Sequence, residues 1–109
     1  MIQVEGRITA DNASALAGSD LESAPGPGVL ELYIASSQSD TNVNFSAPPT
    51  IPARAIQPVL RANGTPMMSD MSPISIALAG GERITLGIDI VTAATVGYIA
   101  RYYDLDELG

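Results

Sequence analysis

The side chains that most often perform catalysis are scarce in this chain. Its 109 residues contain no His, Cys, Trp or Lys, so the usual general bases and the thiolate nucleophile are missing. A carboxylate pair could still hydrolyse a glycosidic bond, and Asp104, Asp106 and Glu107 lie close together in the C-terminal DLDELG. Runs of charge at a chain end are usually solvated, so we interpret residues 104–109 as an acidic tail. We therefore expect no enzymatic activity.

Metal binding is restricted in the same way. Transition-metal sites depend on His and Cys, whereas calcium takes oxygen ligands alone. One small-residue stretch offers such oxygens, although their spacing matches no EF-hand loop and an ordinary polar loop is the favoured alternative. The residues concerned are Asp11, Asn12, Ser19, Asp20 and Glu22. We expect no cofactor and leave calcium binding by residues 11–22 open.

The charge balance limits the partners of the protein. Twelve carboxylates against five arginines give a net charge of -7, which should repel nucleic acids and anionic membranes. A glycine-rich phosphate site is not indicated either, because Gly80-Gly81 lies between two apolar runs and is followed by Glu82. We interpret this pair as a hairpin turn. The opening MIQVEGRI does not resemble a signal peptide, and no apolar run approaches the ~18 residues of a membrane helix.

Alternating apolar residues predict strands along most of the chain. Ile2–Ile8 alternates, with Gly6 as a candidate bulge, and Val29–Ala35 follows the breaker PGPG. The segment from Ile74 to Tyr103 reads as three strands joined by two short turns. Their inward side chains are predicted to be Ile74, Ile76 and Leu78, then Ile84, Leu86, Ile88 and Ile90, then Val96, Tyr98 and Ala100.

These patterns predict an all-β protein of a single domain covering residues 1–109. Six to eight short strands, proline-rich loops and no convincing helix favour an antiparallel β-sandwich or a jelly-roll-like domain.

A cluster of methionines is one candidate contact surface. Met67, Met68 and Met71 lie in a loop flanked by Pro66 and Pro73. Methionine adapts to irregular surfaces, so the cluster could bind a partner protein. The alternative is that the cluster closes the open end of the sandwich.

A proline-rich segment at residues 46–58 is the second candidate. Pro48, Pro49 and Pro52 favour an extended path, with Ile51 and Ile56 as its apolar contacts. This segment could be an arm that lies on a neighbouring molecule, or a crossover loop within the sandwich. Residues 55–60 could form a strand, which Pro58 would confine to a sheet edge.

The stretch LAGGERITLGIDIVTAATVGYIARYY, residues 78–103, together with the proline-rich arm, resembles small β-sandwich virion structural proteins. These are the decoration, cement or minor coat subunits of phage-like capsids. The resemblance implies a non-enzymatic scaffold, displayed in symmetric copies on a virion. It further implies contacts with the major capsid protein or other virion subunits. We expect a homo-oligomer, a trimer being one arrangement, and place Arg101 and the acidic tail at the rim of its contacts.

The alternative is a soluble module that binds a ligand or carbohydrate through stacked aromatic rings. Its candidates are Tyr33, Tyr98, Tyr102 and Tyr103. Tyr98 and Tyr102 have the same strand parity and Tyr103 the opposite one, so the pattern predicts no flat platform of three rings.

Overall fold

The computed structural model describes residues 1–12, 14–48, 51–69 and 71–105, and its elements are all strands. This confirms the predicted all-β class. The strands are β1 (Ile2–Ile8), β2 (Gly28–Ser36), β3 (Asn42–Ala47), β4 (Ile51–Ile56), β5 (Val59–Leu60), β6 (Ile74–Leu78), β7 (Thr85–Asp89) and β8 (Val96–Asp104). Nowhere in these ranges is there a helix long and apolar enough to cross a membrane.

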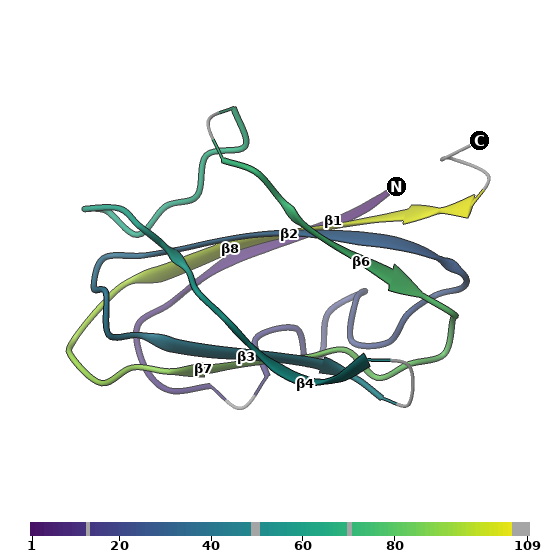
Figure 1. The fold of residues 1–109 in the computed structure, drawn as a ribbon, viewed down its shortest axis with the longest axis horizontal. Coiled ribbons are helices and arrows are strands. Elements are labelled where there is room, and N and C mark those ends of the chain that lie inside the picture. Colours follow the sequence, from purple (N-terminus) through teal and green to yellow (C-terminus); the bar gives the residue numbers. More distant parts are fainter. Residues whose placement is uncertain (13, 49–50, 70, 106–109) are drawn as a thin grey trace.

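The strands form two layers, as a β-sandwich does (Figure 1). Sheet A has the order β1-β8-β2-β5, with β6 also paired to β2, and sheet B has the order β4-β3-β7. All pairings are antiparallel except the short parallel pair of β2 with β5. The core between the sheets consists mainly of aliphatic side chains, and Phe45 is the largest that is fully buried.

The predicted inward faces of the C-terminal strands are confirmed. Eight of the ten side chains are buried, and Ile74 and Ile90 are half-buried against the core. The predicted connections are wrong, however. β6 pairs with β2, β7 pairs with β3, and β8 lies between β1 and β2, so the three strands are not neighbours. Alternation decides which side of a strand is apolar, but both sheets face the same core, so it does not choose the partner.

The Gly80-Gly81 turn is therefore not a hairpin. It carries the chain from β6 in sheet A to β7 in sheet B. Both glycines adopt left-handed backbone conformations, with φ of 107° and 81°, which side chains rarely tolerate.

β1 alternates as predicted, but Gly6 is not a bulge. The register with β8 is unbroken from Ile2↔Tyr102 to Ile8↔Val96. Gly6 pairs with Tyr98, whose ring lies across it, and a Cβ at Gly6 would sit 2.6 Å from the Tyr98 Oη. The glycine leaves room for this ring.

Much of the proline-rich segment is strand. Residues 46–47 end β3 and residues 51–56 form β4, an edge strand of sheet B. The strand predicted at residues 55–60 is divided between β4 and β5, with Gln57 and Pro58 between them. Phe45 pairs with Arg54 and Ala47 with Ile51, so Pro52 and Ala53 together oppose one residue of β3. Proline has no backbone N–H to donate to a neighbouring strand. Pro52 is tolerated because it lies in a bulge of an edge strand, where no such hydrogen bond is required. The bulge also brings Ile51 and Ile56, five positions apart, to the same face.

Candidate interaction surface

The stretch from Asp11 to Ala24 covers the outer edge of β7. Asn12 and Ile88 exchange backbone hydrogen bonds of 2.9 and 2.8 Å, and the Ala15 N–H donates to the Leu86 carbonyl at 2.8 Å. Leu16 and Leu21 are fully buried in the core. This stretch is therefore part of the sandwich, and its backbone satisfies an edge that would otherwise be open.

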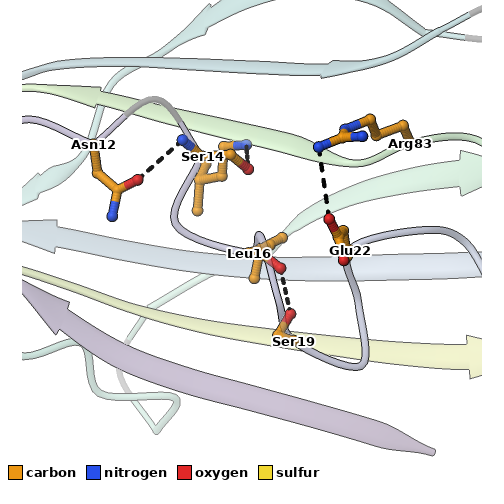
Figure 2. A network of polar contacts seen from close by, with 7 residues as sticks. Asn12, Ser14, Leu16, Ser19, Glu22 and Arg83 are labelled. Atoms are coloured by element: carbon orange, nitrogen blue, oxygen red, sulfur yellow. Dashed lines mark hydrogen bonds and ion pairs between the residues drawn. The ribbon is translucent and has the colours of Figure 1, made fainter.

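Four of the five candidate residues of this stretch contact their own chain, three of them labelled in Figure 2, and Asp20 is exposed. Each of the following contacts fixes a turn or the covered edge. The Asp11 Oδ1 accepts from the Ile90 N–H at 2.7 Å, the Asn12 Oδ1 accepts from the Ser14 N–H at 3.0 Å, the Ser19 Oγ donates to the Leu16 carbonyl at 2.6 Å, and Glu22 lies 3.6 Å from Arg83. In the part of the chain that the structure describes, no three acidic side chains gather to hold a metal. The oxygens named above therefore already have partners within the chain.

Only the start of the acidic tail, Asp104 and Leu105, is among the described residues. Asp104 is exposed at the end of β8, and Asp106 and Glu107 lie outside the described residues. The structure therefore does not place the carboxylate pair that could serve a hydrolase.

The tyrosines are mostly structural. Tyr33, Tyr98 and Tyr102 are buried, and Tyr103 is half-buried on the opposite side of β8, as parity predicts. The Tyr98 hydroxyl donates to the Ala15 carbonyl at 3.0 Å. The Tyr102 hydroxyl donates to the carbonyls of Gly26 at 2.6 Å and Pro27 at 3.2 Å. Burial raises the pKa of Tyr98 above its ordinary value of 10.0. The rings of Tyr98 and Tyr102 thus join the 15–27 segment to sheet A. The four tyrosines form no flat stacking platform, because three are buried.

The methionine loop lies on the outer face of sheet A. Residues 61–73 connect β5 to β6, and their described part, 61–69 and 71–73, runs on the side of the sheet away from sheet B (Figure 1). The loop meets β8 at Gly97, where a Cβ would overlap the Gly64 carbonyl oxygen and come within 2.7 Å of the Pro66 Cδ. Gly97 thus permits the loop to lie flat on the strand.

Two arginines hold the methionines in place. The Arg61 Nη1 lies 3.6 Å from the Met67 Sδ, and the Arg101 Nη1 lies 3.6 Å from the Met68 Sδ. The Met67 N–H donates to the Met71 Sδ at 3.3 Å, which closes the loop on itself. These contacts leave Met67 48% and Met68 39% exposed, and Met71 half-buried. All three lie outside the core between the sheets, so they do not close the end of the sandwich.

Two further apolar side chains precede this loop. Val59 and Leu60 of β5 are 43% and 62% exposed. We name Met67 and Met68 the methionine patch. With Val59 and Leu60, they make four of the seven exposed large hydrophobic side chains of the described residues, all within ten positions of sequence. A cleft of about 380 Å³ lies along the same face, between the start of the loop and β1. Beside it, the Arg7 Nη2 donates to the Thr65 Oγ1 at 2.7 Å.

The two predicted contact regions are not brought together. Pro48 and Pro52 are exposed near the β4 edge of sheet B, Ile51 is half-buried and Ile56 is buried, whereas Pro49 lies outside the described residues. Arg101, in contrast, belongs with the methionines. Its guanidinium contacts Met68 and lies 5.6 Å from the centre of the Tyr103 ring, on the outer face of sheet A.

One buried carboxylate has a structural role that sequence reasoning did not assign. Glu82 is 2% exposed, and its Oε2 and Oε1 accept hydrogen bonds from the backbone N–H groups of Ala79 at 2.8 Å and Gly80 at 2.6 Å. The position of Glu82 directly after a Gly-Gly turn was the available signal. The carboxylate satisfies backbone donors where the chain leaves sheet A.

No family model matches the chain, and no match was found among curated proteins or solved structures.

Proposed function

We propose that the protein is a non-enzymatic structural subunit that binds another protein surface through the methionine patch. The observation that carries this proposal is the exposure of Val59, Leu60, Met67 and Met68 within one stretch of ten residues. Burying such side chains against a partner is favourable at roughly 25 cal/mol per Å² of apolar surface. Methionine side chains also adjust their shape to the surface that they meet.

The support beneath the patch suits this role. Met67 and Met68 are held by Arg61 and Arg101, and the loop that bears them rests on β8 at Gly97. A contact surface on a rigid sheet loses little conformational entropy on binding. We further propose that the partner is a repeated protein lattice, such as the major capsid protein or other subunits of a virion, as the sequence resemblance implies.

The alternative of a carbohydrate-binding module has less support. Three of the four tyrosines are buried, and the hydroxyls of Tyr98 and Tyr102 are engaged by backbone carbonyls.

The proposal is tested by sedimenting an extract of the native source through a density gradient and locating the protein by mass spectrometry. We expect it in the fraction of large particles. A tagged Met67→Ser/Met68→Ser variant should move to the top of the gradient, because the substitutions remove the apolar contact. Val91→Ser is the matched control, since Val91 is 64% exposed outside the methionine patch, and it should sediment with the particles.

The same variants separate contact from stability. Met67 and Met68 lie outside the core, so their substitution should leave the melting temperature of the isolated protein within a few degrees of the original. Finding the unaltered protein only at the top of the gradient would refute the proposal.

A further inference from the structure

The sheet edges of this sandwich differ in how they are protected. An exposed edge presents unpaired N–H and C=O groups and invites pairing with another chain. The β7 edge is covered by residues 11–24, and the β4 edge carries Pro52, a bulge and an exposed arginine. The edge of β2 opposite β8 is divided between β5 and β6, which are two and five residues long.

β1 lacks these protections. It is seven residues long, contains no proline, and keeps an unbroken register with β8. Among the described residues, its backbone hydrogen bonds are those of its pairing with β8. Ile2, Val4 and Ile8 pack against the core but stay half-buried. A further strand beside β1 would cover both the open backbone groups and these apolar side chains.

The sequence of β1 is complementary to itself in one antiparallel register. In a pairing centred on Gly6, Glu5 lies opposite Arg7 of the second copy, and Arg7 lies opposite Glu5. On the other face, Val4 lies opposite Ile8. Opposite charges and apolar pairs directly across a ladder are each favourable.

The neighbouring registers are unfavourable. A pairing centred on Glu5 places two carboxylates opposite each other, and one centred on Arg7 does the same with two guanidinium groups. A shift by one residue turns the apolar face of one copy toward the polar face of the other. The register centred on Gly6 is therefore favoured in two ways. It pairs opposite charges and apolar side chains, and the neighbouring registers place like charges opposite each other.

We propose that β1 is a self-association site, at which two copies of this chain join sheet A edge to edge about a two-fold axis through Gly6. The pairing is isologous, so it closes as a dimer. It differs from the trimer considered from sequence and joins two sheets of five strands into one. The dimer does not depend on the methionine patch, which lies on the outer face of sheet A.

Charge exchange on the full-length protein tests this register. Sedimentation equilibrium should show a reversible dimer of twice the 11.3 kDa chain mass. Glu5→Arg alone, or Arg7→Glu alone, places like charges opposite each other twice, and should raise the Kd at least about tenfold. A mixture of these two variants should form a heterodimer, because every opposed pair is then of opposite charge. The double variant Glu5→Arg/Arg7→Glu should dimerise like the original protein.

Matched controls exclude a general effect of charge. Asp20→Arg and Arg54→Glu make the same changes at exposed positions outside β1 and should leave the Kd within twofold. Thermal unfolding followed by circular dichroism checks that every variant is folded. If the protein is a monomer up to millimolar concentration, or if Glu5→Arg dimerises unchanged, the proposal is overturned.

Cysteine cross-linking gives a second measurement that tolerates weak binding. The chain has no cysteine of its own. Glu5→Cys mixed with Arg7→Cys should form a mixed disulfide under mild oxidation, since opposed Cα atoms of a ladder lie about 4.5–5.5 Å apart. Gln3→Cys mixed with Arg7→Cys should react at least about tenfold more slowly. Equal rates for the two mixtures would also overturn the register.

Discussion

Glu82 shows how a single side chain organises the crossing between the two sheets. It is buried, and its carboxylate accepts from two successive N–H groups of the turn that precedes it. Charged acceptors form hydrogen bonds worth about 1.5–3 kcal/mol each, which offsets the cost of burying the group. The adjacent Gly80 and Gly81 supply the left-handed backbone that turns these donors inward.

Glu82→Gln should lower the free energy of unfolding by about 2 kcal/mol. Glutamine keeps one oxygen acceptor but turns an amide donor toward the second N–H. Urea denaturation measures the change. Glu22→Gln is the control, because the ion pair of Glu22 with Arg83 is largely solvent-exposed and should contribute less than about 1 kcal/mol. Equal losses of unfolding free energy for the two variants would show that the buried hydrogen bonds of Glu82 stabilise the fold no more than the exposed ion pair does.

Tyr98 makes the stability depend on pH at the alkaline end. Burial raises its pKa in the folded protein above 10.0, so the unfolded chain loses the phenolic proton at a lower pH. Stability from the neutral phenol is complete below about pH 10 and is lost as the pH rises through the folded pKa. Urea midpoints measured from pH 8 to 12 should therefore fall less steeply in Tyr98→Phe than in the original protein. Tyr103→Phe leaves Tyr98 in place and should keep the fall; identical curves for all three proteins would contradict this assignment.

At the scale of elements, close approaches at glycine position the contact surface. The 61–73 loop reaches β8 only because Gly97 has no side chain, and β1 and β8 accommodate the Tyr98 ring only because of Gly6. These glycines lie inside strands, where glycine is otherwise disfavoured. Their presence is explained by what packs over them.

Gly97→Ala should separate the loop from the strand. The added methyl group overlaps the Gly64 carbonyl oxygen, and the resulting shift should cost about 1–3 kcal/mol of stability. Limited proteolysis should then cleave within residues 61–73 at least several-fold faster. Gly26→Ala is the control, since its added Cβ would lie 3.7 Å from the Tyr102 Oη, an ordinary contact. Unchanged cleavage in Gly97→Ala would mean that the loop is held elsewhere.

The sequence predicts the strands and their inward faces, because burial of one side leaves a period of two that is legible in Ile84–Ile90. It does not predict their partners, since both sheets face one core. It also misses the edge cover at residues 11–24, where Leu16 and Leu21 are isolated apolar residues in a small polar stretch. Their burial depends on β7, which is more than sixty positions away.

The candidate surface was predicted by residue type and not by position. Clustered methionines indicated either a contact or a plug, and the choice depended on where the loop lies. That location follows from the approach of Gly64 and Pro66 to Gly97, which links distant parts of the chain. The strand at residues 51–56 was not predicted for a similar reason, since a bulge lets Pro52 stay within an edge strand.

For the whole molecule, the ladders of sheet A join distant parts of the chain. β1 pairs with β8 from Ile2↔Tyr102 onward, and β2 pairs with β8 along all nine of its residues. Non-local pairing requires loop closure before contacts can compensate for it, which slows folding.

We expect the main refolding phase to take about milliseconds to seconds, as in other β-sandwiches. Eight prolines should add slower minor phases through isomerisation in the unfolded chain. Stopped-flow fluorescence measures the main phase, and double-jump experiments with a short unfolding time remove the proline phases. Refolding complete within microseconds would contradict this view of the ladders.

The central place of β8 also has a consequence for protein synthesis. A ribosome makes β1 and β2 first, yet neither can pair with β8, which lies between them, until that strand has been synthesised. Until residues 96–104 emerge, β1 has no partner in sheet A and β2 can pair only with β5 and β6, so a product terminated early cannot complete this sheet. Only chains translated as far as β8 can therefore build sheet A, and with it the surface on which the 61–73 loop rests.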